Sequence, residues 1–298
     1  MGVIRAELTD PQAAALAASA RTESGRRTRG MSYARSGPVL ALTTLSAFAA
    51  AELVTTYVDP IAGIAVHAVI LSLLIPAASL AGDDAAGHVP ARFLYSLSVV
   101  PLIRILSLSM PLTRFEPAVW YLMAGLPVFL AGIVIAATLG LRPNALGLRP
   151  SRSLLQPLVV MLGFGLGFAE YQILRPESLT DSLTVSQFVL PAVILMVATG
   201  FLEEFVFRGV LQATAAPLLG WAGIVYVSLV FAVLHIGYRS LADIAFVFVI
   251  ALIYAWVARR TGSIMGVSVS HGITNIVLFL VVPFVPALAA RPEWLNIP

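Results

Sequence analysis

The sequence predicts an all-α, polytopic bundle of about eight or nine transmembrane helices. Hydrophobic residues make up 59% of the 298 residues and charged residues only 11%, whereas a soluble domain carries about 25% charged residues. Apolar stretches of about 20 residues, the length that spans a bilayer as a helix, recur along most of the chain. The sequence lacks the strand-like alternation of polar and apolar residues that would indicate a membrane β-barrel.

The composition excludes several kinds of site. The chain has no cysteine, which rules out disulfides, cysteine-based zinc sites, haem attachment through CxxC and a thiol nucleophile. All basic residues are arginines, a usage typical of GC-rich genomes that favours a bacterial source. The net charge of +3 is small, so we expect membrane lipids, and no nucleic acid, as partners.

The polar residues 1–36 precede the first apolar segment and are rich in arginine. They lack the apolar region and cleavage site of a signal peptide, so we expect a cytoplasmic arm that contacts anionic headgroups. The N-terminal transmembrane helices, within residues 37–184, are expected at 37–56, 61–81, 92–110, 118–141 and 154–173.

The functional core is expected in residues 185–287, followed by a tail at 288–298. Its predicted spans are 185–207, 221–237, 242–258 and 264–287. Residues 208–220 are expected to form a cytoplasmic loop, and 242–258 is, together with 221–237, the shortest of the predicted spans.

The placement of arginine predicts the orientation of the bundle in a bacterial cytoplasmic membrane. With the N-terminus inside, the cytoplasmic loops carry arginines at positions 142, 149, 152, 259 and 260. The opposite loop, 174–184, has Arg175 together with Glu177 and Asp181. This distribution agrees with the positive-inside rule, and an odd number of spans places the C-terminus outside.

The glycine-rich stretch "GFGLGF", residues 163–168, does not predict a nucleotide site. The stretch is not placed between a strand and a helix, as a phosphate-binding loop requires. Close packing of helices through small residues explains it better.

Two adjacent glutamates and an arginine, Glu203, Glu204 and Arg208, lie at the end of an apolar run. On a helix, Glu204 and Arg208 share one face, while Glu203 is about 140° away from Arg208. We therefore expect Arg208 to neutralise Glu204, although a purely structural ion pair is an equal alternative for these two residues. Glu203 is left free, and an unpaired carboxyl group in an apolar setting suits a general base.

Two later segments carry polar residues at helical spacing. "FAVLH" places Phe231 and His235 four residues apart, and "HGITN" does the same for His271 and Asn275. Taken singly, these polar residues would be assigned to hydrogen bonds between helices, and Phe231 to packing. Taken together with the glutamates, they predict a catalytic site inside the membrane.

These three motifs resemble those of the CPBP family of intramembrane proteases. "EEFVFR" fits EExxxR, "FAVLH" fits FxxxH and "HGITN" fits HxxxN, in that order along residues 185–280. The family includes type II CAAX prenyl endopeptidases and bacterial proteins of bacteriocin processing and immunity. The resemblance implies that Glu203 activates a water with help from His235.

The same resemblance implies that His271 and Asn275 hold the developing oxyanion, with Glu204 and Arg208 orienting the site. A metal-free mechanism is favoured because HExxH and other compact two-histidine motifs are missing. The alternative is a zinc ion held by Glu203, His235 and His271, two histidines and one carboxylate with an open position.

The expected function is therefore endoproteolysis of a peptide or protein substrate, lipidated or membrane-anchored, near or within the membrane. A non-catalytic immunity or partner-binding protein on the same fold is the alternative. A transporter is a third hypothesis, weakened by the lack of internal repeats.

Several other polar residues lie in apolar segments without an assigned chemistry. We expect Glu52 and Glu170 to pair with Arg104 or to reach an interface. His67 is expected to pack between helices or to lie at an interface, and Asp243 to be solvated near a helix end.

The predicted spans also contain a conflict of depth. They place Glu203 and His271 toward the cytoplasm and His235 toward the outside. A shared site requires that residues 208–220 re-enter the membrane or that the helix ends differ by several residues.

Overall fold

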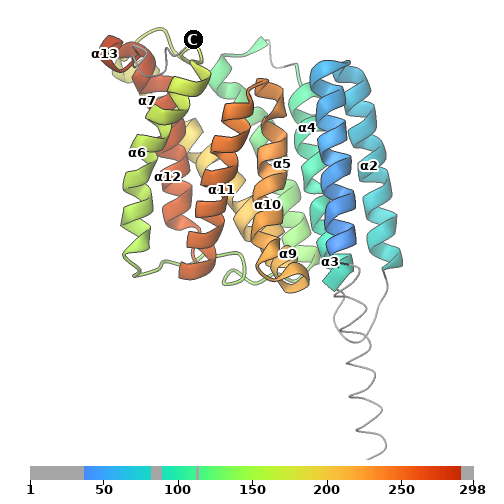
Figure 1. The fold of residues 1–298 in the computed structure, drawn as a ribbon. Coiled ribbons are helices and arrows are strands. Elements are labelled where there is room, and N and C mark those ends of the chain that lie inside the picture. The colour runs from blue at the N-terminus through green and yellow to red at the C-terminus, as the bar shows by residue number, and fades with distance from the viewer. Residues whose placement is uncertain (1–36, 82–88, 112–113, 290–298) are drawn as a thin grey trace, which may run out of the picture.

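The computed structural model describes residues 37–81, 89–111 and 114–289 (Figure 1). Every regular element within these ranges is helical, which confirms the all-α prediction. The predicted arm at 1–36 and most of the tail at 288–298 lie outside the described residues.

The N-terminal half forms the part of the bundle that Figure 1 colours from blue to green. Its first helix is Gly37–Tyr57, and the next five are α2 (Pro60–Leu80), α3 (Val89–Leu97), α4 (Val99–Ser109), α5 (Pro117–Thr138) and α6 (Leu155–Leu174). Helices α3 and α4 together make one apolar segment, Pro90–Ser109, that is long enough to cross a membrane.

The C-terminal half begins with one continuous helical segment of 35 residues, Val185–Leu219. It consists of α7 (Val185–Ile194), a π-helix (Leu195–Phe201), α8 (Leu202–Glu204), a second π-helix (Phe205–Leu211) and α9 (Gln212–Leu219). The predicted loop at 208–220 is therefore wrong, because the chain stays helical as far as Leu219. The turn comes at Gly220, whose φ of +61° favours glycine.

Three helical segments complete the bundle. They are α10 (Ala222–Val233) with a 3₁₀ turn (Leu234–Tyr238), α11 (Leu241–Thr261), and α12 (Met265–Ile276), which continues through a π-helix (Val277–Val281) and a 3₁₀ turn (Val282–Phe284) to α13 (Pro286–Ala289). The Oγ of Ser240 caps α11 by accepting a hydrogen bond from the amide of Asp243. Ala222–Tyr238 is shorter than the eight helices that have spanning length, whereas the predicted short span 242–258 is part of α11, which has 21 residues.

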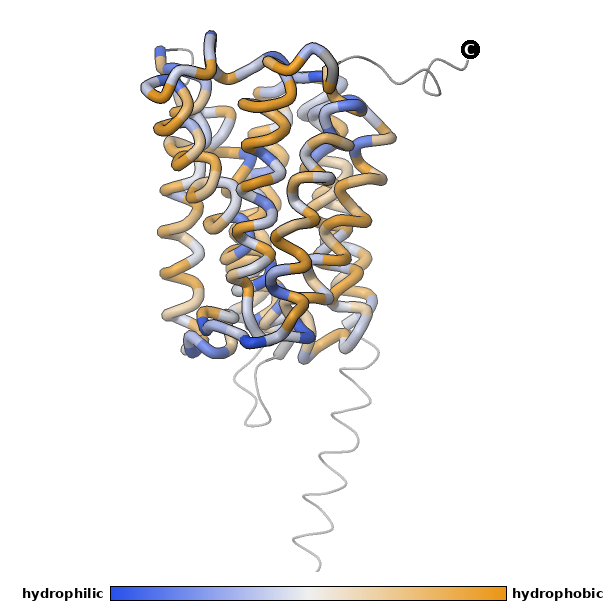
Figure 2. The backbone as a smooth tube through the Cα atoms, turned by 90° about the vertical axis from the view of Figure 1, so that its left-hand side faces the viewer, coloured by the Kyte–Doolittle hydropathy of each residue, from blue (hydrophilic) through white to orange (hydrophobic). Residues whose placement is uncertain are grey.

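The described helices include eight that are long and apolar enough to cross a membrane, in addition to the shorter Ala222–Tyr238. Figure 2 shows hydrophobic residues along the length of the bundle, with hydrophilic residues gathered at its two ends. Large side chains such as Leu42, Leu73 and Leu158 are exposed on the outer surface, as expected where lipid replaces water. The chain is therefore an integral membrane protein.

Close approaches through glycine hold the C-terminal helices together. A Cβ atom at Gly163 would lie 2.5 Å from the carbonyl oxygen of Ser270, and one at Gly167 would collide with the carbonyl oxygen of Thr274. A Cβ at Gly200 would lie 2.6 Å from the oxygen of Ser268. Helix α12 thus packs backbone to backbone against α6 and the 35-residue helix, which supports the packing interpretation of the glycine-rich stretch.

The continuous helix also resolves the conflict of depth. Glu203 lies near the middle of Val185–Leu219 and not at a cytoplasmic end. The chain then turns at Gly220 and runs back along the bundle as α10, so that His235 comes at the far end of this shorter helix. The helix ends, rather than the motifs, were misplaced in the sequence prediction.

Candidate active site

The two glutamates occupy a single α-helical turn between two π-helical segments. Glu203 and Glu204 lie in α8, flanked by the π-helices Leu195–Phe201 and Phe205–Leu211. A π-helix widens the backbone turn and is frequent at functional sites. The wide turns therefore set which way the two carboxylates point.

Glu204 is fully buried and neutralised by two partners. The Nη1 of Arg208 donates to its Oε1 at 3.0 Å, which is the ion pair predicted from the four-residue spacing. The same oxygen lies 2.9 Å from the Nδ1 of His271. Arg208 also donates to the carbonyl oxygen of Ala251 and lies 4.8 Å above the ring of Phe231. A buried carboxylate held this firmly is a fixed part of the site.

His271 is oriented by its bond to Glu204. A carboxylate oxygen only accepts, so Nδ1 of His271 donates and carries a proton. Its other ring nitrogen, Nε2, faces Glu203, with 4.0 Å between Nε2 and the Oε2 of Glu203. This distance exceeds a direct hydrogen bond and is compatible with one bridging water.

His235 is oriented in a similar way by its own helix. Its Nδ1 lies 3.1 Å from the carbonyl oxygen of Phe231. Because a carbonyl oxygen only accepts, Nδ1 holds the proton and Nε2 of the neutral ring keeps a lone pair. The ring of Phe231 packs at 4.8 Å against Phe207 and at 6.1 Å against His271, so this residue has the packing role expected for it.

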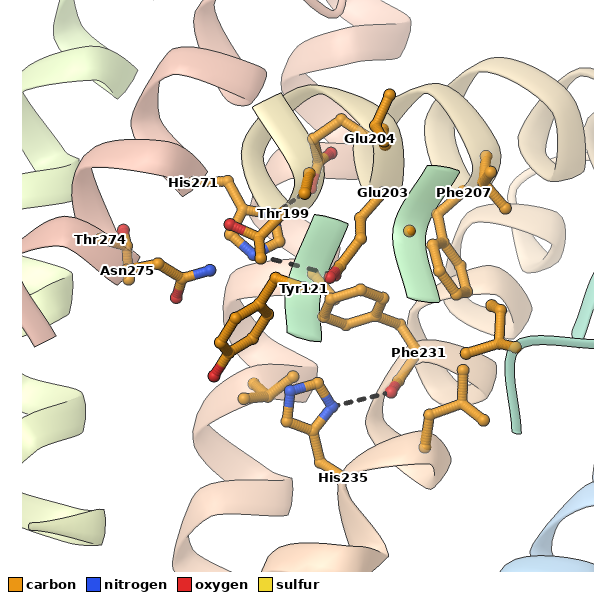
Figure 3. A pocket seen from close by; sticks show the side chains of 18 of the residues that line it. Tyr121, Thr199, Glu203, Glu204, Phe207, Phe231, His235, His271, Thr274 and Asn275 are labelled. Carbon is orange, nitrogen blue, oxygen red and sulfur yellow. Dashed lines mark hydrogen bonds and ion pairs between the residues drawn. The ribbon is translucent and has the colours of Figure 1, made fainter. Parts of the chain in front are cut away.

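One cavity of about 310 Å³ contains all the residues predicted for the site. Glu203, Glu204, Arg208, His235, His271 and Asn275 line it. The side chain of Glu203 is 38% exposed although it lies in the middle of the bundle, because it faces this cavity. Figure 3 shows Glu203, His271 and Asn275 around one space, with His235 below them.

The cavity wall also holds polar residues to which the sequence assigned no chemistry. Glu170 of α6, Arg104 of α4, Tyr121 of α5 and Tyr238 line it. Among the described residues, Glu170 forms no ion pair, whereas Arg104 pairs with Glu52. An ionisable side chain in an apolar span was the signal that could have placed Glu170 and Arg104 in the site.

Two further expectations concern polar residues away from the cavity. Asp243 is fully buried, so the prediction of a solvated side chain is wrong. Its position in the first turn of α11 lets the positive end of the helix dipole offset its charge. His67 is fully buried, with Nε2 3.3 Å from the Oε1 of Glu52, which is the helix-packing alternative and not the interfacial one.

The residues proposed as zinc ligands do not form a metal site in this arrangement. Among the described residues, no three histidine, aspartate or glutamate side chains are placed to hold an ion. Zinc bonds of about 2.0–2.2 Å hold tetrahedral ligand atoms about 3.4 Å apart, and Glu203 and His271 are separated by 4.0 Å. We derive no step through zinc.

Comparison with known proteins gives the site a family context. Residues 185–277 match the family model described as type II CAAX prenyl endopeptidase, Rce1-like. The matched range contains all three motifs and the helices that carry them, and it confirms the resemblance drawn from those motifs. No curated protein and no solved structure matched the chain.

Proposed function

We propose that the chain is an intramembrane endopeptidase. The premise is that residues 185–277, which match the CAAX-type endopeptidase model, form a core of the CPBP family. In this proposal Glu203 is the general base. The observation that carries it is the convergence of three separate motifs on one cavity. A carboxylate, two oriented imidazoles and a carboxamide are the groups that water-mediated amide hydrolysis needs.

The first step is the attack of water on the carbonyl carbon of the scissile peptide bond. A water held between the Oε2 of Glu203 and the Nε2 atoms of the two histidines transfers a proton to Glu203 as its oxygen bonds to the carbon. The lone pair on Nε2 of His235 accepts a hydrogen bond from the second hydrogen of that water, which stays on the attacking oxygen and is directed by this bond.

The second step is the collapse of the tetrahedral intermediate. In this proposal His271 carries a proton on both ring nitrogens before the water attacks and keeps both throughout. The oxyanion accepts hydrogen bonds from the side-chain amide of Asn275 and from Nε2–H of this ring. The C–N bond then breaks, and Glu203 returns the proton to the leaving amine. Glu204, bonded to Nδ1 of His271 and to Arg208, places the compensating negative charge beside that ring.

The substrate class follows from the surroundings of the cavity. The site lies within a bundle whose outer surface is apolar, and Leu202, Val206, Phe231 and Leu278 contribute to the cavity wall. A soluble loop would have little access to it. We therefore propose a peptide segment that is membrane-anchored or lipidated, with membrane lipids as the surrounding partners.

The test begins with cells, because the proposal fixes the reaction but not the sequence that is cut. The C-termini of membrane proteins would be compared between cells with the wild-type chain and cells with Glu203→Gln. Glu116→Gln is the matched control, since Glu116 is an exposed N-cap residue of α5 outside the cavity. New termini should appear with the wild type and the control, and be lost with Glu203→Gln.

A peptide that spans an identified site then allows rates to be measured with the purified protein. Loss of a general base should lower kcat by about 10²–10⁴. If Glu203→Gln cuts the peptide at the wild-type rate, the proposed mechanism is wrong. If Glu203→Gln retains the cellular function while no cleavage is found, the chain is instead a binding protein on the same fold.

A further inference from the structure

A buried ion pair outside the family-matched region contacts the backbone beside His235. The Nη2 of Arg104, on α4, donates to the carbonyl oxygen of Leu234 at 2.8 Å. Leu234 directly precedes His235 in the chain. Neither Arg104 nor its partner Glu52 belongs to residues 185–277 or to the three motifs.

The pair itself is rigid and desolvated. The Nε of Arg104 donates to the Oε1 of Glu52 at 2.8 Å, and Nη2 lies 2.6 Å from Oε2. This two-point contact fixes the plane of the guanidinium as well as its position. Glu52 is fully buried in the first helix, and the side chain of Arg104 is 18% exposed, so thermal motion and water loosen the pair little.

The backbone at His235 needs such a support. Helix α10 ends at Val233, and Leu234–Tyr238 continues as a 3₁₀ turn. Hydrogen bonds in 3₁₀ turns have poorer geometry than those of an α-helix, and this turn ends at Arg239 with a left-handed φ of +57°. The bond from His235 to Phe231 fixes the ring, but it does not fix the backbone that carries the ring.

We propose that Arg104, held by Glu52, is a positioning residue for His235, and that the N-terminal helices thereby complete the active site. This inference rests on the proposed endopeptidase function. The bond to the Leu234 carbonyl holds the backbone that carries His235, and so fixes where its Nε2 meets the water of the proposed mechanism. A displacement of about 1 Å in such a group costs about 10²-fold in rate.

The test uses a double variant that leaves no unpaired buried charge. Glu52→Gln with Arg104→Met removes both charges at once, and loss of both partners of a buried pair is far less destabilising than loss of one. The glutamine keeps a polar neighbour for His67. We expect the folded protein to show kcat lowered about 10–100-fold on a cleavable peptide, with KM changed less than about threefold.

Arg92→Met is the matched control. Arg92 of α3 also donates from Nη2 to a backbone carbonyl at 2.8 Å, that of Leu139, and it does not line the cavity. This variant should keep the wild-type kcat. The kcat of Arg104→Lys should lie between those of the wild type and of the Glu52→Gln, Arg104→Met variant, since an ammonium group cannot reproduce the two-point contact with Glu52.

A double-mutant cycle separates positioning from general stability. If Arg104 acts through His235, the Glu52→Gln, Arg104→Met change should lower kcat by less than about twofold once His235 is already alanine. The proposal would be overturned if the Glu52→Gln, Arg104→Met change lowered kcat by the same factor in the His235→Ala protein as in the wild type. It would also be overturned if the double variant had the wild-type kcat. Either result would leave the endopeptidase assignment intact, because that assignment is tested separately by Glu203→Gln.

Discussion

At the scale of single residues, the side chain of Asn275 offers a sharp test of the proposed oxyanion site. Asn275 lies one helical turn beyond His271 and lines the same cavity. Asn275→Ala should lower kcat by about 10²–10³, the typical cost of removing one oxyanion donor, with little change in KM. Cleavage rates of the purified protein measure this.

The control for Asn275 is Ser268→Ala on the same helix. Ser268 is buried, its hydroxyl has no hydrogen-bond partner among the described residues, and it does not line the cavity. This variant should cleave at close to the wild-type rate. A wild-type kcat for Asn275→Ala would remove Asn275 from the mechanism.

Residue spacing predicted local contacts and missed tertiary ones. The four-residue interval was enough to predict the Glu204–Arg208 ion pair, because the two side chains share a helix. It could not show that His271, 67 residues away, shares the same oxygen of Glu204. Asp243 was misjudged for the same reason, since its burial depends on neighbouring helices that no local pattern describes.

At the scale of elements, the helix that carries the glutamates differs most from its prediction. The sequence predicts that the helix ends before Arg208, because a charged side chain is expected at the membrane surface. Arg208 is only 4% exposed, because Glu204 neutralises it, so the charge belongs inside the helix. The two π-helical segments could not be predicted either, since a hydrophobic pattern does not distinguish a helix of 3.6 residues per turn from one with a wider turn.

The close packing of α12 on the 35-residue helix gives an element-scale prediction. Gly200 lies one turn before Glu203, and Gly200→Ala would push against the carbonyl oxygen of Ser268. The separation of the two helices would increase the distance between Glu203 and His271. We expect the free energy of unfolding to fall by about 1–3 kcal/mol and the cleavage rate to fall with it.

Gly165→Ala is the control for this helix contact. Gly165 lies in α6, and a Cβ there has no atom within 4 Å. Thermal unfolding in detergent and peptide cleavage should both remain at wild-type values. If Gly200→Ala also leaves thermal unfolding and peptide cleavage at wild-type values, the backbone contact does not set the geometry of the site.

At the scale of the whole molecule, hydropathy predicted the number of crossings better than their ends. The eight candidate spans and the shorter Ala222–Tyr238 correspond one to one with the predicted apolar segments. The first described helix therefore begins at one end of the bundle, and the last described span, Met265–Phe284, finishes at the opposite end (Figure 1). What hydropathy could not supply was the depth of Glu203, which depends on how far one helix extends beyond the bilayer thickness.

The orientation of this bundle in the membrane can be tested because the chain has no cysteine. A single cysteine then reports one position. Asn144→Cys lies on an exposed loop beside Arg142 and Arg149, and Asp181→Cys lies on an exposed loop at the opposite end. Arginine-rich loops stay on the cytoplasmic side, so a membrane-impermeant maleimide should label Asn144→Cys in inside-out vesicles and Asp181→Cys in right-side-out vesicles.

The reverse labelling pattern would place the N-terminal end of the bundle outside and refute the positive-inside assignment. Both variants should cleave peptide at the wild-type rate in detergent, because neither position touches the cavity. Orientation also bears on the substrate, since it decides from which side a membrane-anchored segment reaches His235. A cytoplasmic placement of Asn144 would put the 3₁₀ turn of His235 toward the outer face (Figure 1).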